Sequence, residues 1–173
     1  MTQGVTLVLG GAASGKSTIA ETLALACGGD PLYIATAQRF DTEMAQKIAA
    51  HVAARGNRWT TIEEPFDLAR ALDHASPDHT VLIDCATLWL TNLMLEDRDL
   101  AAEEEALFGA LASCPAPVVI VSNEVGQGIV PDNALARRFR EAQGRLNIRL
   151  AARAETVVHV VAGLPNLLKG KMP

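Results

Sequence analysis

The sequence predicts an α/β fold in which a mostly parallel sheet is covered by helices on both faces. The first observation behind this prediction is that short apolar runs alternate with helix-forming segments along the whole chain. The second is a glycine-rich loop that joins the first apolar run to the first helix. The third is the length of 173 residues, which usually makes one compact domain, so we expect residues 1–173 to form a single domain.

The first strand, loop and helix follow one another directly. Residues 5–9 are an apolar run typical of a strand, and residues 18–26 are good helix formers. Between them, Gly10 to Ser17 (GGAASGKS) match the phosphate-binding pattern G-x-x-x-x-G-K-[ST], and the strand and helix on either side are the context that this pattern requires. The predicted fold is therefore of the P-loop NTPase type, and we expect the RecA-like form.

The residues of this loop suit a phosphate group chemically. Small side chains let backbone N–H groups converge on an anion, and the positive end of the following helix dipole points at the same place. We expect Lys16 to reach the β and γ phosphates and the Ser17 hydroxyl to be a ligand of Mg²⁺. The alternative is a glycine-rich turn that binds nothing, which the flanking strand and helix disfavour.

A second buried strand is predicted at residues 32–36, after the turn formed by Gly28 to Pro31. Its carboxyl end carries Ala35 to Gln38. Nucleotide-binding sheets place ligand contacts outside the carboxyl ends of their strands, so this segment is a candidate for such contacts.

A helix is predicted over residues 42–55, with Asp41 as its cap. Lys47, His51 and Arg55 form a row at four-residue spacing on this helix. Two neighbouring cations disfavour protonation of an imidazole, and the same three groups can bind phosphate. A half-buried histidine with two solvated basic neighbours explains the same spacing, and the spacing alone favours that alternative.

The next part of the chain is less regular. Residues 59–63 alternate between apolar and polar side chains, and residues 66–75 predict a modest helix after a proline. Glu63 and Glu64 have the pattern of surface charges.

The third clear strand covers residues 80–83 and ends at Asp84. An acid at the end of an apolar strand forms the second half of a P-loop site, where it holds Mg²⁺ directly or through water. Ser17 and Asp84 are therefore the predicted metal ligands.

Residues 87–112 read as helical with a break near 97–99, and the acidic cluster Glu103 to Glu105 is most simply a solvated face. A fourth strand is expected at 117–122. It runs into residues 123–131 (NEVGQGIVP), a polar pair followed by two glycines and a proline. This segment is either a substrate loop or an ordered connection, and its position favours the substrate loop.

A long helix is predicted from a cap at Asp132 or Asn133 to about Ala154. Its apolar stripe predicts core packing or a subunit interface. Its six arginines are interpreted as solvated faces and ion pairs, because few aromatics accompany them. Residues 156–162 predict a fifth strand, and residues 163–173 a tail.

The composition excludes several functional classes. No apolar run approaches the roughly 20 residues of a membrane span, and no basic and apolar leader precedes the first strand, so we expect a cytoplasmic protein. A net charge of −5 argues against nucleic-acid binding. Cys27, Cys85 and Cys114 lack metal-ligand spacing and are expected to be small buried side chains.

Together the motifs resemble one known family, the bifunctional adenosylcobinamide kinase and adenosylcobinamide-phosphate guanylyltransferase of cobalamin biosynthesis. The resemblance covers nearly the whole chain, and its most specific parts are the histidine helix ending in W-x-T-x-E and the loop NEVG-x-GIVP. The stretches that carry it are GGAASGKS, YIATAQ, DTEMAQKIAAHVAARGNRWTTIEEP, and NEVGQGIVP with the following ARRFREAQGRLNIRLA.

The resemblance implies two reactions. The γ-phosphoryl group of ATP or GTP passes to the aminopropanol hydroxyl of adenosylcobinamide, with Mg²⁺ as cofactor and Lys16 as a catalytic residue. A histidine that aligns with His51 then attacks GTP, and the resulting GMP-histidine intermediate gives GMP to adenosylcobinamide phosphate, forming adenosylcobinamide-GDP. The resemblance also implies a homotrimer.

The nucleotide-binding residues are expected from the loop motif and from the resemblance. Glu63 is well suited to a guanine edge, because a carboxylate accepts hydrogen bonds from both N1–H and the exocyclic amine. The expected set is Gly10, Gly11, Ala12, Ala13, Ser14, Gly15, Lys16, Ser17, Ala35, Thr36, Ala37, Val52, Ala53, Ala54, Arg55, Glu63 and Asp84.

Two positions depart from the family pattern: Ala13 stands where the family usually has arginine, and Asp84 where it commonly has glutamate. Either change can alter nucleotide preference. Two rival functions remain, an ordinary P-loop small-molecule kinase in which His51 is structural, and a non-catalytic GTP-binding switch.

Overall fold

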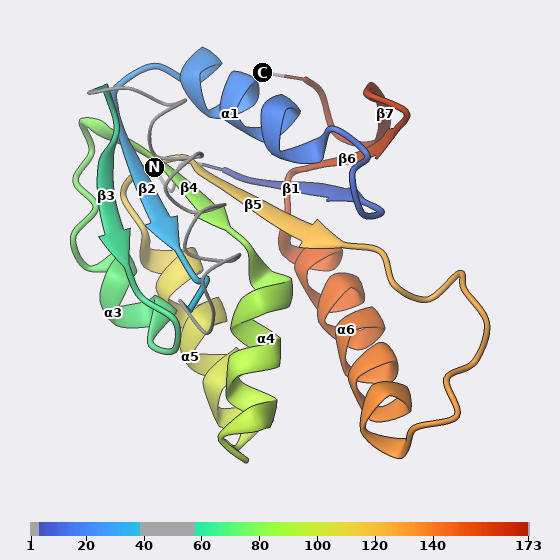
Figure 1. The fold of residues 1–173 in the computed structure, drawn as a ribbon. Coiled ribbons are helices and arrows are strands. Elements are labelled where there is room, and N and C mark those ends of the chain that lie inside the picture. Colours follow the sequence, from blue (N-terminus) through green and yellow to red (C-terminus); the bar gives the residue numbers. More distant parts are fainter. Residues whose placement is uncertain (1–3, 39–57, 173) are drawn as a thin grey trace.

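The computed structural model describes residues 4–38 and 58–172. Figure 1 shows one twisted sheet with α1 on one face and the remaining labelled helices on the other. The elements are β1 (Val5–Gly10), α1 (Lys16–Ala26), β2 (Asp30–Ala35), β3 (Thr60–Glu63), α3 (Leu68–Leu72), β4 (His79–Asp84), α4 (Ala86–Leu95), α5 (Leu100–Ser113), β5 (Val118–Asn123), α6 (Ala134–Arg153), β6 (Thr156–Val161) and β7 (Leu164–Lys169).

The sheet has seven strands in the order β3-β2-β4-β5-β1-β6-β7. The six strands from β3 to β6 in that order pair in parallel, and β7 pairs antiparallel with β6. The predicted α/β class, with a mostly parallel sheet and helices on both faces, is therefore confirmed. Because all parallel strands end at the same edge, the loop after β1 and Asp84, the last residue of β4, face the same side of the molecule.

The burial of β5 on both faces explains why its sequence is a continuous apolar run. Val118 and Ile120 pack among the helices α3 to α6, while Val119 and Val121 pack on the side of α1. All four are buried, since successive side chains of a strand point to opposite faces and both faces are covered. Each such side chain contributes roughly 1.5–3 kcal/mol through its burial.

The helix boundaries agree with the capping signals. Asp99 accepts hydrogen bonds from the N–H groups of Ala101 and Ala102 at the start of α5, which confirms the predicted break between two helices. Asn133 accepts one from Ala136 and is the cap of α6. The helix predicted at 66–75 is shorter, Leu68–Leu72, and the helix predicted at 42–55 lies outside the described residues.

The prediction of a C-terminal tail at 163–173 is wrong. Residues 164–169 form β7, which pairs with β6 as a hairpin. The turn consists of Ala162 and Gly163, whose φ angles of 51° and 77° suit a tight hairpin turn. The strand signal was weak because all six residues of β7 are exposed, and because Pro165 is tolerated only on an edge strand.

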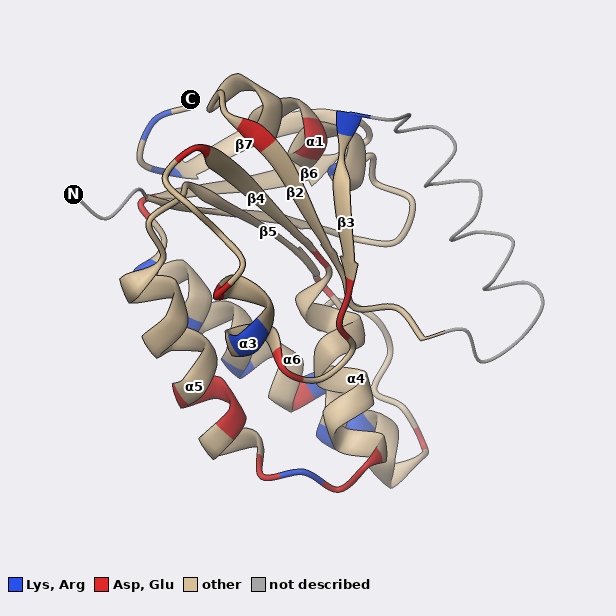
Figure 2. Ribbon diagram, turned by 90° about the vertical axis from the view of Figure 1, so that its left-hand side faces the viewer, with Lys and Arg blue, Asp and Glu red and all other residues tan. Residues whose placement is uncertain are grey.

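The prediction that the acidic cluster on α5 is a solvated face is also wrong for one of its members. Glu104 is 8% exposed and forms an ion pair with Arg149 of α6, which also pairs with Glu105. The Arg149 guanidinium lies 4.6 Å from the ring centroid of Phe108. Figure 2 shows an acidic stretch in red on α5. The cluster therefore joins α5 to α6.

Two further expectations need correction. Glu64 is 8% exposed rather than a surface charge, because its carboxylate accepts hydrogen bonds from the loop that leads into α3. Cys85 and Cys114 are buried as expected, but Cys27 is exposed at the end of α1.

Candidate active site

The segment Gly10–Ser17, called the phosphate loop below, connects the end of β1 to α1. Gly15 has a φ of 90° and immediately precedes the first helical residue, Lys16. The N-terminus of α1 has no side-chain cap, so its first N–H groups are available to an anion. Residues 13–18 line a hollow of about 310 Å³. The loop thus has the form that its sequence pattern predicts.

The side chain of Lys16 lies back over this loop. Its Nζ donates a hydrogen bond of 3.0 Å to the carbonyl oxygen of Gly11. A phosphate oxygen is a stronger acceptor for an ammonium group than a neutral carbonyl is. Lys16 is therefore placed to exchange this contact for one with a bound phosphate.

The C-terminal hairpin supports the phosphate loop, a role that the sequence did not indicate. The N–H of Gly163, in the turn between β6 and β7, donates a hydrogen bond of 2.8 Å to the carbonyl oxygen of Ser14. A Cβ atom on Gly15 would lie 3.1 Å from the Cα of Gly163, and one on Gly10 would lie 2.9 Å from the carbonyl oxygen of Val160. The glycines of the motif are thus required by close backbone packing as well as by the turn.

Asp84 ends β4 and is half-buried. Its Oδ2 accepts a hydrogen bond of 2.8 Å from the hydroxyl of Tyr33 on β2. Tyr33 is 4% exposed, and its ring meets that of Trp59 edge to face with the centroids 6.0 Å apart. Tyr33 was not among the predicted site residues, because nothing local in the sequence relates it to a residue 51 positions away.

The hydroxyl of Thr36 makes hydrogen bonds within the protein. Its Oγ1 accepts a hydrogen bond from the N–H of Cys85 and donates one to the carbonyl oxygen of the same residue, both 2.8 Å long. The carbonyl of Thr36 accepts from Asn92 of α4, which also donates to Pro65. The hydroxyl therefore joins the ends of β2 and β4. The N–H of Thr36 also donates to the carbonyl oxygen of Asp84, so the polar groups of Thr36 have partners within the protein, and its predicted nucleotide contact stays a prediction.

Three predicted residues lie side by side at the sheet edge. Ala35 is in register with Glu63 on one side and with Asp84 on the other. Glu63 is exposed at the end of β3, where Figure 2 shows an acidic segment, and Ala37 is half-buried just beyond the strand. The structure thus places Ala35, Glu63 and Asp84 at the same edge as the phosphate loop, which follows β1, two strands along from Asp84 on β4.

The other predicted residues lie outside the described part of the chain. These are the predicted nucleophile and the four residues after it, His51, Val52, Ala53, Ala54 and Arg55. Their roles remain sequence-based predictions.

The loop after β5, residues 124–133, is held by the arginines of α6. Arg140 donates to the carbonyl oxygens of Gly126 and Gly128. Arg137 donates to those of Pro131 and Asp132 at 2.8 and 2.6 Å. Arg137 is exposed, as expected for a solvated face, and both arginines also hold this loop in place.

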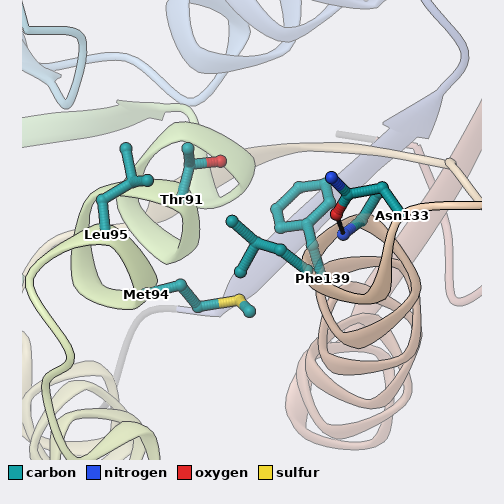
Figure 3. A pocket seen from close by; sticks show the side chains of 7 residues that line it. Thr91, Met94, Leu95, Asn133 and Phe139 are labelled. Carbon is teal, nitrogen blue, oxygen red and sulfur yellow. Dashed lines mark hydrogen bonds between the residues drawn. The ribbon is translucent and has the colours of Figure 1, made fainter.

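An apolar hollow of about 440 Å³ lies between the distal ends of α4 and α6. Figure 3 shows Met94 and Leu95 of α4 on one side and Phe139 of α6 on the other. Leu95 and Leu135 are exposed there. The predicted apolar stripe of α6 is therefore core at Leu146 and Leu150 and lines a surface hollow at its N-terminal end.

The thiol of Cys85, the residue after Asp84, has a shifted pKa. Burial, and then the neighbouring Asp84 carboxylate, raise the pKa of the Cys85 thiol to about 11. Cys85 is therefore a neutral thiol near neutral pH and not a nucleophile.

Comparison with solved structures supports the fold. The P4 protein from bacteriophage phi6, solved in complex with ADP, matches with a TM-score of 0.50 and 16% sequence identity, over 94% of this chain and 52% of that chain. At this identity the likeness concerns the fold alone, and the present chain spans about half the length of that protein. No helix in the described residues is both long and apolar enough to cross a membrane.

Comparison with known sequences is more specific. The bifunctional adenosylcobalamin biosynthesis protein CobP of Pseudomonas aeruginosa is 48% identical over 168 residues, which are 95% of this chain and 97% of the relative. The corresponding protein CobU of Salmonella typhimurium is 46% identical over 177 aligned residues, 91% of this chain and 96% of the relative. The family model of cobinamide kinase / cobinamide phosphate guanyltransferase matches residues 6–168. The chain therefore belongs to the cobinamide kinase / cobinamide phosphate guanyltransferase family.

Proposed function

We propose that this protein phosphorylates adenosylcobinamide with ATP or GTP and then transfers GMP from GTP to the product, forming adenosylcobinamide-GDP. The observation that carries the proposal is a phosphate loop with an uncapped helix N-terminus at the same sheet edge as Asp84 and Glu63, in a chain that belongs to this family.

The residues of the phosphate loop account for the first reaction. The backbone N–H groups and Lys16 bind the β and γ phosphates and stabilise the charge that develops during transfer. The aminopropanol hydroxyl attacks the γ-phosphorus, and the nucleoside diphosphate leaves with the bridging oxygen. Because phosphoryl transfer requires little covalent chemistry from the protein, positioning and electrostatics supply most of the catalysis.

The donor set suits Mg²⁺. The Ser17 hydroxyl and the Asp84 carboxylate are hard oxygen donors, and Mg²⁺ is commonly held by one or two carboxylates with substrate phosphates and water. Among the described residues, no group of three or more His, Cys, Asp or Glu forms a separate metal cluster, which is compatible with such a sparse site. When bound, Mg²⁺ neutralises charge on the phosphates, while Tyr33 fixes the orientation of Asp84.

The second reaction rests on the histidine that the family resemblance identifies. A neutral imidazole of His51 attacks the α-phosphorus of GTP, and pyrophosphate leaves. A phosphate oxygen of adenosylcobinamide phosphate then attacks the GMP phosphorus and the imidazole leaves. Arg55 keeps the imidazole deprotonated and stabilises the leaving pyrophosphate. Glu63 accepts hydrogen bonds from the guanine edge, and residues 35–37 and 52–54 complete the nucleotide contacts.

The remaining proposals concern the protein as a whole. We propose that residues 1–173 act as one cytoplasmic domain, that three copies form a homotrimer, and that nucleic acid is not a partner. Sedimentation equilibrium of the purified protein measures the oligomeric state directly.

Labelled nucleotide tests the proposed function. The pure protein is incubated with Mg²⁺ and GTP labelled on the α-phosphorus, then denatured. We expect protein-bound label that is acid-labile and alkali-stable, as a phosphoramidate is. The label should be absent in His51→Ala and retained in His74→Ala, whose histidine is exposed just after α3.

The same assay separates the rival functions. A small-molecule kinase with a structural His51 predicts phosphorylation of adenosylcobinamide without protein-bound label. A GTP-binding switch predicts nucleotide binding with neither label nor corrinoid product. If GTP binds but no label forms at any Mg²⁺ concentration or pH, the guanylyltransferase assignment is wrong.

A further inference from the structure

Asn123 is the last residue of β5, and neither the phosphate-loop pattern nor the family resemblance assigns it to the nucleotide. The strand β5 lies between β1, which leads into the phosphate loop, and β4, which ends at Asp84. Asn123 is in register with Gly10, the first residue of that loop. Its position in the sheet therefore lies between the two halves of the proposed site.

The face of the sheet to which Asn123 points follows from its neighbours. Val119 and Val121, which are four and two residues earlier, pack on the side of α1. Ser122 points to the opposite face, where its hydroxyl donates to Asn147 of α6 at 2.6 Å. Because side chains alternate along a strand, the Asn123 amide points to the α1 side. Leu82 packs on that side as well, so Asp84 shares this face.

The backbone of Asn123 is fixed without help from its side chain. Its N–H donates to Oγ1 of Thr87 at 2.7 Å, and its carbonyl oxygen accepts from Nδ2 of Asn147 at 3.0 Å. The next N–H, of Glu124, donates to the carbonyl oxygen of Gly10 at 3.0 Å. These contacts connect Asn123 to α4, α6 and β1, so removal of the amide leaves its position supported.

The side-chain oxygen of Asn123 is buried and has no hydrogen-bond partner within the described protein. Leaving a polar atom in this state is unfavourable, and such atoms are few in native proteins. Three side-chain oxygens are in this state in the described residues, and a second one is Oγ of Ser14 in the phosphate loop. A ligand bound at the loop would supply partners to Asn123 and Ser14, whereas the third oxygen, Oε1 of Gln143, lies on the α6 face of the sheet.

We propose that the Asn123 amide binds the terminal phosphoryl group of the triphosphate and orients the hydroxyl that attacks it. An amide carries both a donor and an acceptor, so Nδ2 donates to a γ-phosphate oxygen while Oδ1 accepts from the hydroxyl. The hydroxyl oxygen forms the new bond to phosphorus, the bond to the bridging oxygen breaks, and its electrons leave with the diphosphate. The hydroxyl proton passes to water, since the amide orients the group without taking the proton.

This inference deepens the proposed function and rests on it. It makes Asn123 a catalytic residue for phosphoryl transfer, and it predicts that the residue distinguishes a triphosphate from a diphosphate. A purely structural role predicts neither of these effects.

The test compares Asn123→Ala with Asn166→Ala, whose asparagine is exposed on the edge strand β7. Affinities for ADP and for a non-hydrolysable ATP analogue are measured with Mg²⁺, together with kcat for phosphorylation of adenosylcobinamide. For Asn123→Ala we expect ADP affinity within about twofold of wild type. Analogue affinity and kcat should each fall about tenfold or more, the size of a hydrogen bond to a charged group. Asn166→Ala should match wild type.

Thermal unfolding and a second variant separate the proposed role from a structural one. The Tm of Asn123→Ala should be unchanged or higher, because an unpaired buried oxygen is removed. Asn123→Asp should weaken analogue binding more than Asn123→Ala does, because a carboxylate repels the phosphate. An equal loss of affinity for both nucleotides with a lower Tm, or an unchanged analogue affinity and kcat, would overturn the proposal.

The measurements of nucleotide affinity also distinguish a failure of this inference from a failure of the proposed function. If the wild-type protein binds the analogue through Lys16, as judged from Lys16→Ala, but phosphorylates no corrinoid, the proposed function fails. The ratio of analogue to ADP affinity still decides whether Asn123 contacts the terminal phosphate.

Discussion

The hydroxyl of Tyr33 donates a 2.8 Å hydrogen bond to Oδ2 of Asp84 between neighbouring parallel strands. Tyr33 is buried and its ring packs edge to face against Trp59, so the hydroxyl has little freedom to move. The carboxylate is therefore oriented before any ligand binds, which is what a metal ligand requires of its supporting hydrogen bonds.

Replacing Tyr33 with phenylalanine removes this hydrogen bond and keeps the ring. If Asp84 helps to hold Mg²⁺, the variant should need about tenfold more Mg²⁺ for half-maximal binding of a triphosphate analogue. Binding of the analogue in EDTA should stay unchanged, since the phosphate loop is untouched. Identical Mg²⁺ titrations for the two proteins would show that Tyr33 does not support a metal ligand.

The three cysteines should differ sharply in reactivity. Cys27 is exposed, whereas Cys85 and Cys114 are buried. Burial raises the pKa of the Cys27 and Cys114 thiols, and burial followed by the Asp84 carboxylate raises that of Cys85 to about 11. The accessibility of Cys27 therefore sets it apart from Cys114. At pH 8 only about one Cys85 thiol in a thousand would be ionised.

We therefore expect an aromatic disulfide reagent at pH 8 to modify one thiol per chain quickly in the native protein and all three after unfolding. Cys27→Ala should abolish the fast phase. A fast phase of two or three thiols in the wild-type protein would contradict the burial of Cys85 and Cys114.

The fold was predictable because its main signals are local. Runs such as Val118 to Val121 are apolar because both faces of the strand are covered, and the caps Asp99 and Asn133 stand where the pattern of a helix begins. The strand β7 escaped prediction because it has neither signal. It is exposed and contains a proline, and its pairing with β6 depends on the Ala162–Gly163 turn.

The site was predictable only where a local pattern encodes it. The phosphate loop and Asp84 carry such patterns, but the hydrogen bonds that support them join residues far apart in the sequence. Tyr33 and Asp84 are 51 residues apart, and Thr36 and Cys85 are 49 apart. One sequence contains no signal for such pairs, since they depend on the register of β2 against β4. The positioning of His51 and Arg55 rests on the family resemblance alone.

Glu64 should make stability depend on pH. Burial alone would raise its pKa, but hydrogen bonds from Arg70 and from the N–H groups of Asp67 and Phe66 outweigh burial and lower the pKa from 4.5. A carboxyl group with a lowered folded-state pKa stabilises the fold above its unfolded pKa. This contribution is lost as the pH falls through the lower, folded value.

Glu64→Gln should therefore lower Tm at pH 7 by about 2–4 °C, and the difference from wild type should disappear as the pH falls below about 4. Glu96→Gln, at an exposed position at the end of α4, should change Tm little at any pH. A Tm difference for Glu64→Gln that does not shrink as the pH is lowered would mean that its effect is not one of charge.

Two glycine-to-alanine substitutions should change stability in opposite directions. Gly109 lies in the middle of α5, exposed, with no atom within 4 Å of the Cβ that alanine would add. Alanine should stabilise the helix by about 1 kcal/mol, or about 2–4 °C in Tm for a chain of this size. Gly163 also has open space around a Cβ, but its φ of 77° is in the left-handed region. Alanine there should cost about 1–2 kcal/mol.

The second substitution should also affect the site, because the N–H of Gly163 supports the carbonyl of Ser14 in the phosphate loop. Any change in the turn between β6 and β7 alters that hydrogen bond, so Gly163→Ala should weaken ADP binding while Gly109→Ala leaves it unchanged. Calorimetric unfolding and equilibrium nucleotide binding measure the two effects separately. If Gly163→Ala lowers Tm but binds ADP as the wild-type protein does, the C-terminal hairpin stabilises the sheet edge without shaping the phosphate loop.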